Sequence, residues 1–140
     1  MTDSILPVLA AIIHDSRGRV LIARRGKGTA RAGYWEFPGG KLKPGETPDS
    51  GIRREIAEEL QMQIDVIEMA GIVNYVYPDL NILLIAFHCR MLSEPGELLA
   101  HDRIDWQDVK GLQTDQFSAA DRELIRILQN SDTQFQFTTQ

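Results

Sequence analysis

Gly-Gly-Lys-Leu-Lys-Pro-Gly-Glu-Thr-Pro-Asp-Ser-Gly-Ile-Arg-Arg-Glu-Ile-Ala-Glu-Glu-Leu, residues 39–60, leads from a glycine-rich turn directly into a predicted helix. Glu55, Glu58 and Glu59 are three and four residues apart, which places their carboxylates within an arc of about 100° on one helical face. Neighbouring like charges are destabilising unless a cation lies among them. Hard divalent cations such as Mg²⁺ favour carboxylate and carbonyl oxygens and share their sites with substrate phosphates. The stretch therefore predicts a metal site.

The sequence also marks the ends of this helix. Thr47 is a suitable N-cap and Pro48 suits the first helical position, so we expect the helix to run to about Leu60. Ile52, Ile56 and Leu60 recur at a spacing of four and predict the face that packs on a sheet. A solvated acidic face is the common alternative for paired glutamates, but the preceding glycine turn favours the metal site.

Length and composition suit one domain. The chain has 140 residues, 43% hydrophobic and 25% charged, so we expect residues 1–140 to form a single domain. Residues 131–140 are polar and are expected to form a frayed tail. The net charge of −5 argues against binding to duplex nucleic acid, which normally needs a basic face. Nucleotides are not excluded, because a metal and a few arginines hold a phosphate chain locally.

Neither a membrane segment nor a signal peptide is expected. The longest apolar run, Ile82–Phe87, is far too short to cross a bilayer, and the first four residues lack the basic and apolar parts of a signal peptide. Cys89 is the only cysteine, so an internal disulfide is impossible. These features predict a cytoplasmic protein with no membrane partner.

Most of the remaining sequence favours β-structure. Ile5–His14 and Val20–Ala23 predict a hairpin, Ile64–Tyr77 and Asn81–Met91 a longer hairpin, and Arg103–Trp106 a short strand. The strands outnumber the helices and are not regularly interleaved with them. This pattern indicates an α+β protein with a mixed β-sheet flanked by helices.

The second of these helices is predicted near the C-terminus. Ser118 is its expected N-cap, and the helix should run to about Leu128. Its spacing places Leu124, Ile127 and Leu128 toward the core.

Written as spacing, the opening stretch is Gly40-x5-Glu46-x7-Arg54-Glu55-Ile56-x-Glu58-Glu59. It resembles the Nudix box, G-x5-E-x7-R-E-U-x-E-E-x-G-U with U aliphatic, and the flanking residues 21–25 and 35–40 are similar to the family's MutT branch. The resemblance extends over residues 5–130. It implies an α/β/α sandwich that uses Mg²⁺ or Mn²⁺ to hydrolyse a nucleoside diphosphate linked to another group.

The resemblance also implies roles for individual residues. These are metal binding and base chemistry for Glu55, Glu58 and Glu59, a metal-ligating carbonyl for Gly39, alignment of the glutamates for Arg54, and support of the loop–helix junction for Gly40 and Glu46.

The sequence departs from the family pattern at two places. Gln61 stands where the box has glycine, so it either adopts a left-handed cap at a cost of about 1 kcal/mol or lets the helix run on. Many relatives place a further glutamate in a later loop, and the corresponding position here is Ala100, followed by His101 and Asp102. Asp102 is a candidate replacement as metal ligand, and an exposed loop acid is the equal alternative.

Residues outside the box are expected to select the substrate. By strand alternation only one of Arg24 and Arg25 should face the site, and the resemblance favours Arg25, whose guanidinium suits phosphate. Phe37 or Trp35 could stack on a base, and the resemblance favours Phe37 as lining of the nucleotide site, with Trp35 in the core. Lys41 is a further candidate for substrate binding.

Asp121 is the fourth candidate for substrate binding. It follows Phe-Ser-Ala-Ala, in the place where MutT has an asparagine that reads the base. An ionised aspartate only accepts hydrogen bonds and would suit a base that presents an amino group, whereas a guanine-like edge would require a protonated Asp121. Alternatively, Asp121 and Ser118 form a variant capping box.

Together these features predict a nucleoside triphosphate pyrophosphohydrolase that releases a monophosphate and pyrophosphate. The expected substrate is a modified nucleotide, either an oxidised purine of the 8-oxo-dGTP type or a cytosine nucleotide of the CTP or 5-methyl-dCTP type. Alternatives are a hydrolase of nucleotide sugars or dinucleotides and a nucleotide sensor without turnover. The protein is expected to be a monomer or a homodimer.

Overall fold

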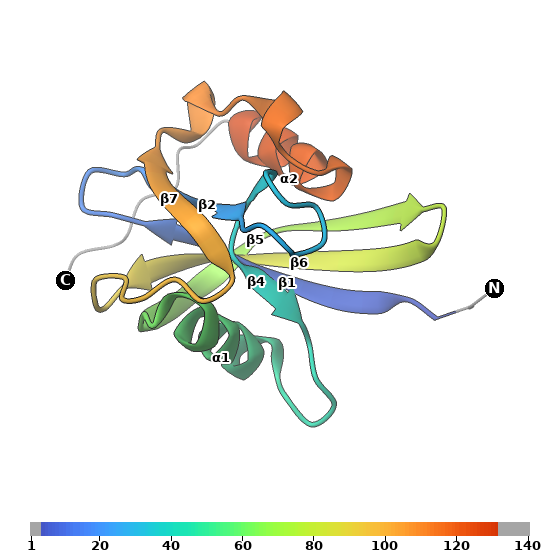
Figure 1. Ribbon diagram of the computed structural model, residues 1–140, viewed down its shortest axis with the longest axis horizontal. Helices are drawn as coiled ribbons and strands as arrows, with labels where there is room; N and C mark the ends of the chain where they lie inside the picture. The colour runs from blue at the N-terminus through green and yellow to red at the C-terminus, as the bar shows by residue number, and fades with distance from the viewer. Residues whose placement is uncertain (1–3, 132–140) are drawn as a thin grey trace.

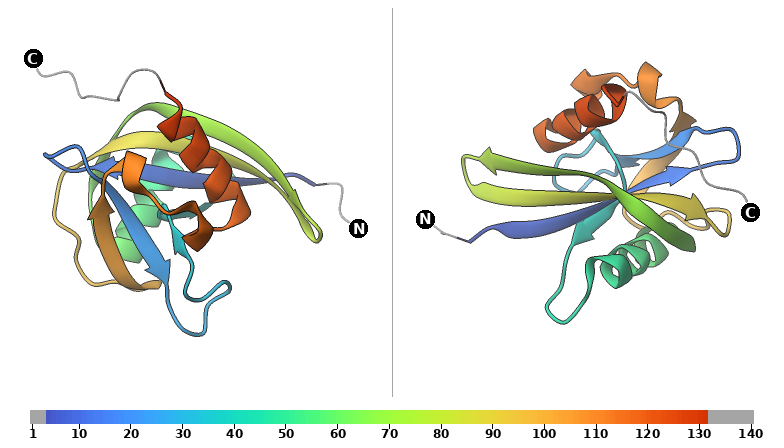
Figure 2. Two further views of the ribbon diagram at one scale, coloured as in Figure 1. Left: turned by 90° about the horizontal axis from the view of Figure 1, so that it is seen from above. Right: turned by 180° about the vertical axis from the view of Figure 1, so that it is seen from behind.

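The computed structural model describes residues 4–131 and contains one mixed sheet with a helix on each face (Figures 1 and 2). The strand order is β3-β2-β1-β6-β5, with β4 paired to β1 and β7 paired to β2. The predicted α+β class and mixed sheet are confirmed. The strands are β1 (Leu6–His14), β2 (Val20–Arg25), β3 (Trp35–Glu36), β4 (Gly39–Lys41), β5 (Ile64–Tyr77), β6 (Leu80–Met91) and β7 (His101–Gln107), and the α-helices are α1 (Pro48–Leu60) and α2 (Ala119–Gln129), with 3₁₀ turns at Val109–Gly111 and Thr114–Gln116.

Strand β1 lies at the centre of this sheet. It pairs in parallel with β6 from Leu6 opposite Ile82 to His14 opposite Arg90. The predicted hairpin of β1 and β2 forms, but its register pairs His14 with Val20 near the turn, and β4 takes the antiparallel place beside residues 8–10 of β1. Along the same edge of β1, β2 therefore pairs near the C-terminal end and β4 pairs with residues 8–10. This places the glycine turn, which forms β4, in the middle of the fold.

Helix α1 covers one face as predicted. Thr47 is its N-cap, and the Thr47 and Ser50 side chains form a capping box. Ile52, Ile56 and Leu60 are completely buried. They pack in one core cluster with the side chains that β1 and β2 present to this face.

Helix α2 covers the opposite face (Figure 2, right). Leu124 is buried as predicted, but the prediction for Ile127 is wrong, because Ile127 is 43% exposed while Ile125 is completely buried. Gly71 of the edge strand β5 lies beside both Leu124 and Ile127. Since α2 lies over the edge of the sheet, one flank of its apolar face extends past the core.

Three other expectations concern the whole chain. Cys89 is buried and is a free thiol. Among residues 4–131, no helix is long and apolar enough to cross a membrane. The frayed tail expected for residues 131–140 lies outside the described residues from residue 132 onward.

Candidate active site

The two glycines of the turn contact α1 and β1 so closely that neither position has room for a side chain. A Cβ atom on Gly40 would lie 2.6 Å from the carboxylate of Glu55, and a Cβ on Gly39 would lie 1.9 Å from the carbonyl oxygen of Leu9. Both distances are far shorter than any van der Waals contact. The first glycine of the pair therefore lets β4 pair closely with β1, and the second leaves room for the Glu55 side chain.

Arg54 connects the acidic residues of this segment. Its guanidinium donates to Glu46 at 2.5 and 3.0 Å, to Glu55 at 3.1 Å and to Glu58 at 3.1 Å. It also donates to the carbonyl oxygen of Lys41 at 3.3 Å. The hydrogen bond from Arg54 lowers the pKa of Glu46 to about 2. This geometry suits the predicted role of Arg54 in aligning the glutamates.

Glu59, like Glu55, lies deeper in the structure than Glu58. Its side chain is 17% exposed, compared with 56% for Glu58. Burial, followed by the like charges of Glu36 and Glu55, raises the pKa of Glu59 to about 8. Among the described residues, the Oε1 atom of Glu59 has no hydrogen-bond partner.

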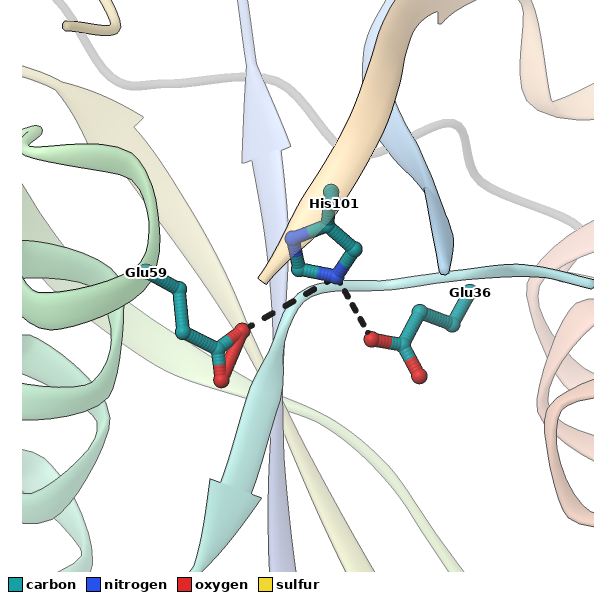
Figure 3. Close-up of side chains that lie close together, drawn as sticks. All are labelled: Glu36, Glu59 and His101. Atoms are coloured by element: carbon teal, nitrogen blue, oxygen red, sulfur yellow. Dashed lines mark hydrogen bonds and ion pairs between the residues drawn. The ribbon is translucent and has the colours of Figure 1, made fainter. Parts of the chain in front are cut away.

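The buried face of Glu59 is closed by two residues that we did not predict as site residues, Glu36 and His101 (Figure 3). The Nε2 atom of His101 lies 2.7 Å from Oε2 of Glu36 and 3.9 Å from Oε1 of Glu59. One ligand atom from each residue lies within 4.8 Å of the others. The only signals in the sequence were the alternation of Glu36 with Trp35 and Phe37 and the place of His101 beside the expected loop acid.

The structure does not bring Asp102 into this cluster. β2 and β7 pair Arg24 with Arg103, but a bulge then places His101, and not Asp102, opposite Arg25. The Asp102 carboxylate instead accepts a hydrogen bond from Nε of Arg24 at 2.8 Å and is 40% exposed. The histidine, and not the predicted aspartate, thus faces the glutamates.

A cavity of about 280 Å³ adjoins the cluster. All four predicted substrate-binding residues line it, together with both glycines of the turn, Glu36 and Arg31. The four are Arg25, Phe37, Lys41 and Asp121. Since Glu36 belongs to both the cavity wall and the cluster, the two form one continuous site.

The two neighbouring arginines of β2 separate as alternation predicts. Arg25 lines the cavity and donates from Nη1 to both carboxylate oxygens of Glu36, at 3.2 and 3.3 Å. Arg24 pairs with Asp102, and its guanidinium lies over the ring of Trp35. Of these two arginines, Arg25 is the one that can contact a ligand in the cavity.

Asp121 is buried in the first turn of α2. Ser118 is the N-cap of the helix without a side-chain hydrogen bond, so the alternative capping box does not form. The Asp121 carboxyl instead accepts a hydrogen bond from the backbone N–H of Phe37. Burial, and then the charge of Glu36, raises the pKa of Asp121 to about 8. At neutral pH this side chain is an uncharged acid with both a donor and an acceptor.

These donor groups fit a divalent cation. The cluster offers carboxylate oxygens and an imidazole nitrogen, and one buried carboxylate oxygen has no partner among residues 4–131. A cation would relieve the repulsion among Glu36, Glu55 and Glu59, and such ions prefer these ligands.

Comparisons with known proteins give one consistent family. Residues 5–128 match the NUDIX domain. An 8-oxo-dGTP diphosphatase of Haemophilus influenzae is 30% identical over 138 residues, which cover 96% of this chain and 99% of the relative. A CTP pyrophosphohydrolase of Escherichia coli is 41% identical over 61 residues, 44% of each chain.

Solved structures agree with this match. A MutT protein from Methanosarcina mazei superposes with a TM-score of 0.78 at 23% identity, covering 90% of this chain and 94% of that one. The ORF135 protein of Escherichia coli superposes with a TM-score of 0.72 at 30% identity, covering 89% and 88%.

Proposed function

Since the chain belongs to the NUDIX family and is a Nudix hydrolase of the MutT-like branch, we propose that it hydrolyses a nucleoside triphosphate to the monophosphate and pyrophosphate. The observation that carries this proposal is the continuity of the site. The glutamates of α1 and the cavity that holds the predicted substrate residues share Glu36 as a common wall. A nucleotide in the cavity would therefore place its phosphates beside the glutamates.

We assign the metal-binding, aligning and proton-accepting roles in this reaction to different residues of α1 and the glycine turn. Glu55, Glu58 and Glu59 would hold Mg²⁺, with the Gly39 carbonyl as a further ligand, and Arg54 keeps the helix carboxylates in register. The bound cation supplies charge neutralisation at the phosphate oxygens and acidifies water. Glu59 is proposed to accept a proton from water in its ionised form, which a bound cation would favour although burial raises its pKa.

Two residues are proposed to hold the phosphates. Arg25 and Lys41 stand on β2 and β4 at the cavity wall, and both are cations. The guanidinium of Arg25 is positioned by Glu36 and by the carbonyl oxygen of Ala30, to which its Nε donates at 2.5 Å. An arginine fixed in this way binds phosphate oxygens at a small entropic cost.

The base would lie in the cavity against Phe37 and Asp121. A protonated Asp121 both donates and accepts, so it suits the O6 and N1–H edge of a guanine-like base as well as the N3 and N4 edge of cytosine. The preference for an amino edge expected from an ionised aspartate therefore disappears. We propose a modified nucleotide as substrate, either 8-oxo-dGTP-like or cytosine-based, and removal of such nucleotides from the cellular pool as the task.

A substrate panel tests this proposal. The purified protein with Mg²⁺ is assayed on 8-oxo-dGTP, dGTP, CTP, 5-methyl-dCTP, a nucleotide sugar and a dinucleotide, with pyrophosphate and phosphate measured separately. We expect pyrophosphate from at least one triphosphate, and a loss of at least about 100-fold in Glu59→Gln. Turnover of the nucleotide sugar or dinucleotide alone, or binding without turnover, would overturn it.

A further inference from the structure

The cluster of Glu36, Glu59 and His101 contains a donor that the glutamate helix alone does not explain. We propose that His101 binds the divalent cation of this site through Nε2, beside Glu36 and Glu59, and gives the site a preference for transition-metal cations over Mg²⁺. The proposal rests on the proposed metal-dependent hydrolysis, and it concerns which cation the site prefers and which residues hold it.

Three rigid elements bring the donors together. Glu36 is in β3 and His101 begins β7, and both strands pair with β2, while Glu59 stands in the last turn of α1 (Figure 3). The bulge after Arg24 is what turns His101 toward the glutamates. A donor fixed by strand pairing and by a helix is held accurately enough for coordination.

The distances suit a shared cation. Two ligands on one ion with bonds of about 2.1 Å lie about 3.0–3.4 Å apart, depending on the bond angle. The Nε2 atom of His101 lies 2.7 Å from Glu36 and 3.9 Å from Glu59, on either side of this range. Relative to Nε2 of His101, a shift of about 0.5 Å or less in each carboxylate oxygen would bring both distances into this range.

Burial supports a ligand at this point. The side chain of His101 is fully buried, and Oε1 of Glu59 lies nearby without a hydrogen-bond partner among the described residues. An unpaired buried carboxylate oxygen is unfavourable, and a cation between it and the imidazole would offset this cost. Coordination through Nε2 places the imidazole proton on Nδ1, which has no partner within residues 4–131, so the bound ion must also offset this buried N–H.

The donor set decides the preference. Mg²⁺ favours an all-oxygen environment, whereas imidazole nitrogen raises the affinity for Mn²⁺ and, more strongly, for Co²⁺. An aspartate at this place, as the sequence led us to expect for Asp102, would have kept the set purely oxygen. His101 at this place adds a nitrogen donor to the site, while the glutamates of α1 remain the same.

Pulsed electron paramagnetic resonance of Mn²⁺ bound to the nucleotide-free protein tests this proposal directly. The chain has three histidines, and the other two, His14 and His88, hydrogen-bond to each other at 2.8 Å. We expect ¹⁴N coupling from an imidazole in the parent protein and none in His101→Gln. Glu36→Gln is the matched control, because it replaces a carboxylate donor by a neutral amide, leaves the imidazole in place and should retain the imidazole coupling.

Competition between cations supplies the second readout. In His101→Gln, affinities for Mn²⁺ and Co²⁺ should fall by about 10-fold or more, while affinity for Mg²⁺ should change less. Thermal unfolding of both variants checks that they are folded. Absent ¹⁴N coupling in the parent, or coupling unchanged in His101→Gln, would overturn the proposal. Equal losses for all three cations would assign His101 a positioning role instead and would also overturn it.

These measurements separate this proposal from the function itself. Nitrogen coupling without turnover of any triphosphate would leave the metal ligand standing and remove the proposed reaction. Turnover without nitrogen coupling would leave the proposed reaction standing and remove His101 as a metal ligand.

Discussion

At the scale of single residues, Gly39 and Gly40 stand next to each other and lack side chains for different reasons. The space beside Gly39 is filled by the backbone of β1, and the space beside Gly40 is filled by the carboxylate of Glu55. The contact at Gly39 should therefore matter for the stability of the fold, and the contact at Gly40 for the geometry of the site. Substitution of each glycine should affect stability and activity differently.

We expect Gly40→Ala to lower kcat/KM by about 100-fold, because its methyl group would displace Glu55 by about 1 Å or more. Gly39→Ala should instead lower the free energy of unfolding by about 3 kcal/mol, because the backbone of Leu9 cannot move aside easily. Denaturant unfolding and steady-state kinetics on both variants check this. A larger stability loss in Gly40→Ala than in Gly39→Ala would contradict it.

Asp121 makes stability depend on pH. Its pKa is raised in the folded protein from 3.8 to about 8, so between these values the folded state holds a proton that the unfolded state has lost. The stabilisation from this proton is complete below about pH 4 and is lost as pH rises through about 8. The charge of Glu36 strengthens the shift and that of Arg31 opposes it.

Asp121→Asn should remove this dependence, because the amide stays neutral and still accepts from the N–H of Phe37. The free energy of unfolding of the variant, relative to the parent, should rise by up to about 1.4 kcal/mol per pH unit as pH increases from 5 to about 8, and should level off above that. Denaturant titrations at several pH values measure the difference. A constant difference would show that Asp121 is ionised throughout.

At the scale of elements, two residues with unfavourable helix propensity, Gly51 within α1 and Gln61 at its C-terminal end, have a tertiary explanation. Gln61 adopts the left-handed cap with φ of 47°, and its side-chain oxygen accepts from the N–H of Glu97 at 3.3 Å. Gly51 is buried where a Cβ would lie 2.8 Å from Cδ1 of Leu9. The helix thus tolerates unfavourable local propensity because these positions contact the strand and the loop beside it.

Gly51→Ala should therefore destabilise the protein by about 1 kcal/mol, although alanine favours a helix by about that amount over glycine. Leu9→Ala removes the obstructing methyl groups, so the double variant should lose less than the sum of the two single changes. Thermal or denaturant unfolding of the three variants gives the coupling energy. A stabilising Gly51→Ala would mean that Leu9 moves aside freely.

At the scale of the whole molecule, the cavity is assembled from distant segments. Arg31, in the loop between β2 and β3, places its guanidinium 4.8 Å from the ring centre of Tyr77 at the end of β5. The Tyr77 hydroxyl accepts from the N–H of Ala120 at 3.1 Å. Tyr77 therefore joins the loop, the long hairpin and the start of α2 around the cavity.

Tyr77→Phe should cost about 1 kcal/mol of stability and leave the KM nearly unchanged, since the ring still contacts Arg31. Tyr77→Leu removes the ring as well and should raise the KM several-fold with a smaller change in kcat, because the loop with Arg31 loses its support. Kinetics on the preferred triphosphate measure both. Identical KM values for the two variants would exclude a role for the ring.

The sequence by itself determined the glutamate helix, its N-cap and the family, because these depend on spacings within a single segment. It also determined the fold class, from the order of strand and helix patterns along the chain. Strand alternation indicated that only one of Arg24 and Arg25 faces the site, and the resemblance to the family selected Arg25 and Phe37. Those features follow from periods of two and of about 3.6 residues, which are local. The charge clustering that indicates a metal site is local as well.

Only the tertiary structure decided that His101, and not Asp102, faces Glu59, because a bulge in the pairing of β2 and β7 sets that register. It likewise brought Glu36 into the site and raised the pKa of Asp121 by burial. Cross-strand register and burial depend on residues far apart in the chain. The local pattern therefore predicts the class of reaction, while packing between segments brings together the groups that we propose to bind the metal and the base.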